Sequence, residues 1–327
     1  MELRKDPITR SWVVVGQWSN TCETLGGCPF CPSRANSKPF LLRLPSQGPW
    51  QVMVLPHPDP LYRVEGDPGR RADGIYDVMK PVGADEIVIE TPEHDRKLED
   101  LSEDQIMMVM EAWRLRIEDL KRDFRFKYVS VYKNYGAMAG QEGSHAHSQI
   151  TATTFMPRRV LYELRAARDW YKEKERCVFC DIVKQEERQG KRIVDTHGEF
   201  VAMCPYASRV PYEVWLINRR HNYMFEQLRP DTNLRHLAAL LRRVLRRVRQ
   251  VAPAYHMVLH TSPNTIHPKG ELLSSYWNTI VEDYHWHIEI LPIVETRSKS
   301  YSIKEVYFNA IMPEDAAERL RKLDTNL

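Results

Sequence analysis

One pattern of cysteine and histidine residues occurs twice in this sequence, and it constrains the fold more than any other feature. Each copy has a CxxC pair, a strand-like segment that ends at a histidine, and finally an HxH segment. The first copy contains CPFC at 28–31 and HAH at 145–147, and the second contains CVFC at 177–180 and HWH at 285–287. A chain of 327 residues is long enough for two such units. We therefore expect two tandem repeats, residues 1–160 and 161–327.

Each repeat is predicted to place a long amphipathic helix between strands. In the first repeat, Ser102 and Gln105 form a predicted capping box ahead of an apolar stripe from Ile106 to Leu120. In the second, Asp231 or Thr232 is expected to cap the helix. Strands that flank a helix in each repeat predict an α+β fold of antiparallel sheets with packed helices.

The second long helix carries an apolar face and a basic face. Its predicted inward residues are Leu234, Ala238, Leu241, Leu245 and Val248. Its predicted outward residues are Arg242, Arg243, Arg246, Arg247 and Arg249. A solvated helix face is the simpler interpretation of these arginines, and a phosphate or partner surface is the alternative. A last helix is expected to begin at Pro313.

The HxH segments lie on predicted strands. Because strand side chains alternate between two faces, His145, His147 and Gln149 point to one side. His285, His287 and Glu289 do the same in the second repeat. Each segment therefore aims three polar side chains at one common site.

Two predicted zinc sites follow from the repeated pattern. A CxxC pair supplies two thiolates, and two histidines complete the Cys2His2 set of a structural zinc site. The expected ligands are Cys28, Cys31, His94 and His145 in the first repeat, and Cys177, Cys180, His221 and His285 in the second. His94 and His221 are each expected to close a strand. The alternative interpretation of either CxxC is two buried cysteines or a redox pair.

Composition narrows the class of ligand. Its 47 basic and 44 acidic side chains leave a formal net charge of +3, which does not suggest a nucleic-acid-binding protein. No apolar run is long enough for a membrane span, and the N-terminus lacks a signal-peptide core. Six cysteines are too few for a disulfide scaffold. We expect a cytoplasmic protein that acts on small molecules.

The motifs together resemble the galactose-1-phosphate uridylyltransferase family of the histidine-triad superfamily. The similar segments are RKDPITRSWVVV, CPFC, IETPEH, NYGAMAG, SHAHSQI, VPYEVWL and MPEDAAERLR. The resemblance implies two histidine-triad-like halves, with His147 as the residue that becomes covalently uridylylated and Gln149 in contact with the transferred phosphoryl group. It also implies that Cys28, Cys31, His94 and His145 are structural zinc ligands, and that the protein is a homodimer.

The resemblance further implies the residues that bind substrate. Asn134 and Gly136 match the segment that lines the sugar-phosphate site. The glycine-rich loop that contains Gly140 and Ser144 is expected to bring backbone amides close to phosphate oxygens. Lys304 and Tyr307 lie in a shortened segment where the family recognises the hexose phosphate.

Elementary chemistry agrees with nucleotidyl transfer. An imidazole nitrogen can attack the α-phosphorus of a UDP-sugar, and the leaving sugar phosphate needs no general acid because its second pKa is about 6. An amide at position 149 cannot transfer protons to or from water, which favours transfer over hydrolysis. The predicted reaction is ping-pong exchange between UDP-glucose and galactose 1-phosphate. The alternatives are an adenylyltransferase or phosphorylase acting on ADP-glucose or diadenosine polyphosphates, and a noncatalytic zinc-stabilised nucleotide-binding protein.

Some positions depart from the family pattern. His57 stands where an asparagine is usual near the nucleotide, HAH replaces His-Pro-His, and GQWSNTCETL lacks the usual phosphate-binding arginines. Some family members hold their second metal with a glutamate and histidines, and Glu163, His260 and His287 occupy comparable places. We prefer the cysteine set because CVFC stands beside two suitably spaced histidines.

Overall fold

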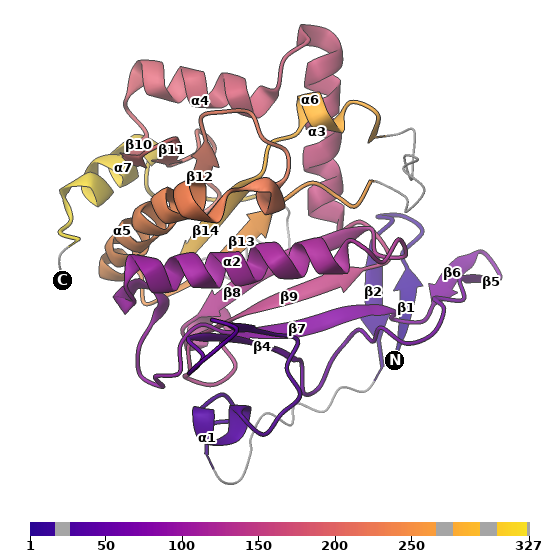
Figure 1. Ribbon diagram of the computed structural model, residues 1–327. Helices are drawn as coiled ribbons and strands as arrows, with labels where there is room; N and C mark the ends of the chain where they lie inside the picture. Colours follow the sequence, from indigo (N-terminus) through magenta and orange to yellow (C-terminus); the bar gives the residue numbers. More distant parts are fainter. Residues whose placement is uncertain (17–26, 266–276, 295–305, 326–327) are drawn as a thin grey trace.

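The computed structural model describes residues 1–16, 27–265, 277–294 and 306–325. Ten antiparallel strands form one continuous sheet (Figure 1). In spatial order these are β10 (Ile193–His197), β11 (Phe200–Met203), β12 (Val214–Asn218), β14 (His287–Ile293), β13 (Ala254–His260), β8 (Tyr128–Tyr135), β9 (His147–Thr153), β7 (Gly83–Ile89), β4 (Val52–Pro56) and β3 (Leu42–Leu44). A smaller sheet has the order β2 (Trp12–Val15), β1 (Glu2–Lys5), β6 (Tyr76–Met79) and β5 (Arg71–Asp73).

The helices cover the large sheet unequally on its two faces. They are α1 (Pro32–Ala35), α2 (Glu103–Leu120), α3 (Arg158–Lys174), α4 (Val178–Gln189), α5 (Arg235–Val251), α6 (Ile280–Asp283) and α7 (Pro313–Lys322). Helices α2 and α5 lie side by side across one face of the sheet (Figure 1). On the opposite face, α3 and α4 pack against β11 and β12 through a second apolar cluster. This second layer covers the C-terminal half of the sheet and leaves Gln149, Thr151 and Thr153 of β9 to line a cavity.

The predicted α+β class is therefore confirmed, and the two repeats contribute five strands each to one sheet. Strand β8 of the first repeat pairs with β13 of the second, with Tyr135 opposite Tyr255. Helices α2 and α5 share the largest apolar core, which contains Trp113 and Leu241. Among the described residues, no helix combines the length and the apolar character that crossing a lipid bilayer requires.

The predicted cap of α2 is half correct. The Ser102 hydroxyl accepts a hydrogen bond from the Gln105 backbone N–H at 3.2 Å. The reciprocal bond of a capping box is absent because the Gln105 amide group donates instead to the carbonyls of Gln51 and Glu90, at 2.7 and 3.0 Å. Gln105 therefore ties the helix to the sheet.

The predicted cap of the second long helix is wrong. A π-helical turn, η4 (Pro230–Leu234), leads directly into α5, and neither Asp231 nor Thr232 caps it. The apolar face is as predicted, since all five expected inward residues are fully buried. The helix is held there by packing of that face, which outweighs a missing cap.

Four of the five predicted outward arginines of α5 bond within the molecule, which neither interpretation of the basic face anticipated. Arg243 and Arg247 form ion pairs with Asp195, at 2.8 and 2.5 Å. Arg249 pairs with the buried Glu99 at 2.9 Å, and Arg246 donates to backbone carbonyls. Most of this basic charge is thus matched by acidic residues and carbonyls of the same chain. The last helix begins at Pro313, as predicted.

Candidate active site and metal-ligand clusters

His147 is the first residue of β9 and lines a small cavity on the face of the sheet away from α2. Asn134, Gly140 and Gln149 line the same cavity. The register of β8 and β9 explains this, because Gln149 lies opposite Tyr132 and brings the end of β8 beside the start of β9. The alternation of strand side chains places His147 and Gln149 on one face, as the sequence predicts.

Hydrogen bonding orients the His147 ring. Its Nδ1 lies 2.8 Å from the carbonyl oxygen of His145. A carbonyl can only accept, so Nδ1 carries the proton and Nε2 keeps a free lone pair. Burial and the charge of Lys133 lower the pKa of His147 to about 4. The imidazole is therefore neutral at physiological pH and has the electronic state of a nucleophile.

A larger cavity of about 660 Å³ opens beside the first. The two share Tyr132, Asn134, Glu142 and Gln149. Aromatic rings of Trp12, Tyr62 and Phe155 line the larger one, together with Arg158. A volume of this size accommodates a ligand as large as a nucleotide sugar.

The remaining predicted substrate residues are placed differently. Gly136 has a φ of 85°, and a Cβ there would lie 2.9 Å from the carbonyl oxygen of Pro253, so glycine is required for the backbone path. The Ser144 hydroxyl is 2.8 Å from Nε2 of His94 and so contacts the first cysteine–histidine cluster. Tyr307 is 58% exposed and lies outside the group that lines the small cavity. Lys304 and most of the GQWSNTCETL segment lie outside the described residues.

The first predicted ligand set comes together in space. The ligand atoms of Cys28, Cys31, His94 and His145 all lie within 4.8 Å of one another, and this group could hold a metal ion. Nδ1 of His145 is 3.6 and 3.7 Å from the two sulfurs, and Nδ1 of His94 is 3.4 Å from Cys31 Sγ. Zinc bonds of about 2.3 Å to sulfur and about 2.0–2.1 Å to nitrogen give a tetrahedral S···N edge of about 3.6 Å. The donor spacing fits zinc.

The second predicted set repeats this geometry. Cys177, Cys180, His221 and His285 also place their ligand atoms within 4.8 Å. Cys180 Sγ lies 3.3 and 3.6 Å from Nδ1 of His221 and His285. The cysteine composition is therefore assembled in the second repeat as in the first.

Backbone carbonyls fix the tautomer of two of these four histidines, His145 and His221. Nε2 of His145 donates to the carbonyl of Thr91 at 2.7 Å, and Nε2 of His221 donates to the carbonyl of Val281 at 2.7 Å. A proton on Nε2 leaves Nδ1 unprotonated, and this Nδ1 faces the cysteine sulfurs. Such carbonyl partners commonly orient the histidine ligands of metal sites.

One expectation about these histidines is wrong. Strand β7 ends at Ile89 and β12 ends at Asn218, so His94 and His221 lie in the turns beyond the strands. The turns carry the histidines away from the sheet to reach the CxxC segments. Apolar periodicity locates the strand, and the polar residues that follow it belong to the loop.

A third group lies beside the second set. Glu163, His260, His287 and Glu289 also have ligand atoms within 4.8 Å of one another. Nδ1 of His260 is 2.9 Å from Glu163, and Nε2 is 3.5 Å from Glu289. Although burial lowers the pKa of His260, the two carboxylates raise it to about 10. His260 is thus a buried cation between two carboxylates, and its single positive charge offsets one of their two negative charges.

Three residues beside His147 carry no signal in the HxHxQ pattern. The Phe30 ring lies 5.2 Å from the His147 ring. Lys133 Nζ donates to the His147 carbonyl at 2.9 Å, and Glu142 lines both cavities. Phe30 stands inside the CPFC motif, which is the one signal that could have indicated it.

Comparison with known proteins identifies relatives along the whole chain. Residues 63–157 match the family model "Galactose-1-phosphate uridyl transferase, N-terminal domain", and residues 163–326 match the corresponding C-terminal domain. The ADP-glucose phosphorylase of Arabidopsis thaliana is 28% identical over 341 residues, which cover 98% of this chain and 93% of that protein. The galactose-1-phosphate uridylyltransferase of Thermotoga maritima is 27% identical over 345 residues, which cover 100% of both.

Solved structures agree with these sequence relationships. A structure described as that of a uridylyltransferase has a TM-score of 0.81 at 29% identity, and the match covers 98% of this chain and 97% of that chain. An Arabidopsis thaliana ADP-glucose phosphorylase with bound ADP-glucose has a TM-score of 0.78 at 26% identity, with 99% of each chain covered. The chain belongs to the galactose-1-phosphate uridylyltransferase family.

Proposed function

We propose that the chain transfers a nucleotidyl group from a nucleoside diphosphate hexose through a covalent bond to His147 Nε2. The observation that carries this proposal is the His147 ring, whose Nδ1 is bonded to the His145 carbonyl at 2.8 Å while the ring lines a cavity. Nδ1 is occupied by this hydrogen bond, and Nε2 is left as the nucleophile.

The reaction has two half-reactions. In the first, the Nε2 lone pair attacks the α-phosphorus, a P–N bond forms, and the bond to the hexose 1-phosphate oxygen breaks. That oxygen leaves with the electron pair and needs no proton, because a phosphate monoester has a second pKa of about 6. In the second, a phosphate oxygen of the acceptor attacks the same phosphorus and the P–N bond breaks, which regenerates the neutral imidazole.

Gln149 is proposed to contact the transferred phosphoryl group. Its side chain lies two residues beyond His147 on the same strand face and lines both cavities. The amide N–H can donate to a phosphoryl oxygen, but an amide does not exchange protons with water in this pH range. The covalent intermediate is therefore expected to react with a phosphate acceptor rather than with water.

Zinc would be held by the two cysteine–histidine sets, which form closed sites with four protein ligands. Such a site supplies structural cross-links and leaves no open position for a reacting group. In the first set, His145 would be fixed two residues before His147, and its carbonyl oxygen would then hold the His147 ring. The metal set and the nucleophile are thus joined by one hydrogen bond.

We take exchange of UDP-glucose with galactose 1-phosphate as the first candidate reaction, as the family membership and the Thermotoga maritima relative favour it. ADP-glucose phosphorolysis is the second candidate. It is supported by the Arabidopsis thaliana relative and by the similarity to a structure with bound ADP-glucose. In both reactions the roles of His147 and Gln149 are the same, and only the base and the acceptor differ.

A paired assay separates the two candidates. The purified protein is incubated with UDP-glucose and galactose 1-phosphate, and in parallel with ADP-glucose and inorganic phosphate, and the loss of each nucleotide sugar is measured. Turnover of UDP-glucose that depends on galactose 1-phosphate supports the first candidate. Turnover with adenine nucleotides alone would replace it with the second, and turnover in neither assay would contradict both.

A further inference from the structure

We infer that the second repeat holds a separate site that binds a nucleotide without reacting with it. The site is a cavity of about 960 Å³ between α4, the start of β12 and the segment after β11. Trp215 on β12 lies four strands from β9 in the sheet order, a distance of about 19 Å at the usual strand spacing. The cavity is therefore separate from the one beside His147.

The strand registers place this cavity next to the counterpart of the candidate active site. Ile87 lies opposite Gln149 in the first repeat, and Trp215 lies opposite Glu289 in the second. Phe30 of CPFC lies 5.2 Å from the His147 ring, and Phe179 of CVFC lies 5.1 Å from the His287 ring. Trp215 therefore lies between the cavity and β14, which is the strand of the second repeat that corresponds to β9.

His287 itself is sealed from the cavity. Its ring centroid is 5.1 Å from that of Trp215 and 4.8 Å from that of His260, and the residue is 1% exposed. Glu289 replaces the glutamine and pairs with Arg209 at 2.8 Å. A carboxylate in that place would repel a phosphoryl group, so no nucleotidyl transfer is expected here.

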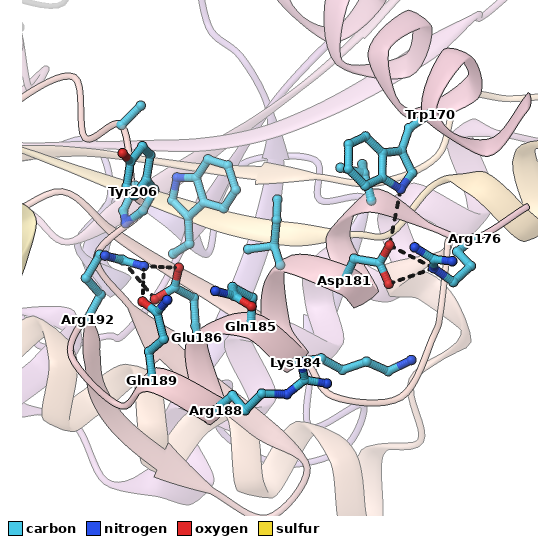
Figure 2. Close-up of a pocket in the computed structure, with 15 residues that line it drawn as sticks. Trp170, Arg176, Asp181, Lys184, Gln185, Glu186, Arg188, Gln189, Arg192 and Tyr206 are labelled. Carbon is cyan, nitrogen blue, oxygen red and sulfur yellow. Dashed lines mark hydrogen bonds and ion pairs between the residues drawn. The ribbon is translucent and has the colours of Figure 1, made fainter. Parts of the chain in front are cut away.

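The long α4 builds a wall that the first repeat lacks. CPFC is followed by the four-residue α1, whereas the twelve-residue α4 begins at Val178, inside CVFC. Figure 2 shows two hydrogen-bonded groups at opposite ends of this wall, Trp170 with Asp181 and Arg176 at one end, and Arg192 with Glu186 below Tyr206 at the other. Aromatic rings therefore stand at both ends of the cavity, where a planar base can stack.

Two cations along α4 could bind the phosphate groups of a nucleotide. Lys184 and Arg188 are exposed and line the cavity. Within the described parts of the chain, neither side chain has a hydrogen bond or an ion pair. The side chains of Arg176 and Arg192 in the same cavity both form ion pairs. Their i,i+4 spacing places two like charges side by side, which costs stability unless an anion lies between them. A phosphate group offsets that repulsion, and the combination of rings and paired cations indicates a nucleotide.

Equilibrium dialysis of the zinc-loaded, full-length protein against radiolabelled ADP and UDP tests this inference. We expect two molecules per chain of the nucleotide whose base the candidate active site accepts, and one molecule per chain of a nucleotide that it rejects. The double variant Lys184→Glu, Arg188→Glu should weaken one of the two sites at least tenfold and leave the exchange activity within about twofold of wild type. The test measures binding, so its outcome does not depend on His147 being the nucleophile.

Two controls keep the result specific. Lys172→Glu with Lys174→Glu changes the net charge equally at exposed positions outside the cavity lining, and it should retain both sites. Trp170→Leu should weaken the second site for ADP while inorganic pyrophosphate binds as before. No more than one molecule of either nucleotide per chain in the wild type, or two in the Lys184/Arg188 variant, would overturn the inference. Equal binding of pyrophosphate and ADP would show an anion site rather than a nucleotide site.

Discussion

Two histidines with the same local sequence spacing, His147 and His287, differ in whether a substrate can reach them. His147 follows His145 by two residues and lines a cavity, whereas His287 follows His285 by two residues and is sealed beneath Trp215. In both, Nδ1 of the ring donates to the carbonyl oxygen of the histidine two residues earlier, at 2.8 and 3.2 Å. Their surroundings, rather than the HxH pattern, decide which one can reach a substrate.

Gln149→His tests whether the amide suppresses hydrolysis. A third imidazole could carry protons between water and the leaving group, so we expect the hydrolysis of UDP-glucose in the absence of acceptor to rise at least tenfold. The measurement is the ratio of hydrolysis to exchange. Gln149→Met removes the amide without adding a proton carrier, and it should lower both rates together. An unchanged ratio in Gln149→His would contradict the role that we assign to Gln149.

At the level of single residues, the sequence predicts those that belong to repeated motifs. Both CxxC pairs, the four partner histidines and the shared face of His147 and Gln149 follow from spacing and alternation. Phe30, Lys133 and Glu142 could not be predicted as a group, because they reach the site from three separate segments. Only the tertiary fold makes them neighbours.

At the scale of elements, a buried ion pair joins the strands that carry the candidate site. Lys133 of β8 donates to Glu90, just beyond β7, at 2.7 Å, and to the His147 carbonyl on β9 at 2.9 Å. Both side chains are almost completely buried, at 2% and 0% exposed. The pair therefore links three neighbouring segments directly beneath the candidate nucleophile.

Lys133→Met should be strongly destabilising because it leaves Glu90 buried without its partner. We expect a loss of about 3–5 kcal/mol in the free energy of unfolding, measured by urea denaturation. The double variant Lys133→Met, Glu90→Leu should recover most of this loss. Its exchange rate should stay below wild type, because the bond to the His147 carbonyl is still missing. Full activity in the double variant would show that the pair serves stability alone.

The two cysteine–histidine clusters make a prediction about metal content. Cys28→Ser and Cys177→Ser should each remove one zinc equivalent per chain, measured by mass spectrometry of the metal in purified protein. Cys204→Ala is the matched control, since Cys204 is fully buried but belongs to neither cluster. The same zinc content in Cys28→Ser and in wild type would contradict the first site. Loss of zinc in Cys204→Ala would show that the method responds to destabilisation instead.

Helix ends illustrate which elements the sequence predicts well. Ser102 caps α2 as expected, because its hydroxyl needs only the next turn of the same helix. The start of α5 could not be predicted from local signals, since a π-helical turn leads into it without a side-chain cap. Packing of its apolar face against the sheet determines where that helix begins.

At the scale of the whole molecule, the two repeats share one continuous sheet, which the sequence does not indicate. The duplication predicts two similar halves but not that β8 and β13 would pair into one ten-stranded sheet. Tyr135 and Tyr255 stack across this junction with ring centroids 4.8 Å apart. Edge pairing between strands from distant parts of the chain leaves no local sequence signal.

The junction predicts that neither half is stable alone. Separating the repeats at residue 160 would expose the edges of β8 and β13 and divide the core that α2 and α5 share. We expect residues 1–160 and 161–327, expressed singly, to lack a cooperative thermal transition by circular dichroism, and co-expression to restore one. Cooperative melting of either half alone would contradict this account.

Mass spectrometry of the covalent intermediate shows whether His147 is the nucleophile. The protein is incubated with UDP-glucose and, separately, with ADP-glucose, without acceptor, and the intact mass and peptide masses are determined. We predict one nucleotidyl group per chain on the peptide that contains His147, and none in His147→Asn, whereas His287→Asn should still be labelled. Absence of any adduct in the wild type, or an adduct on another residue, would contradict it.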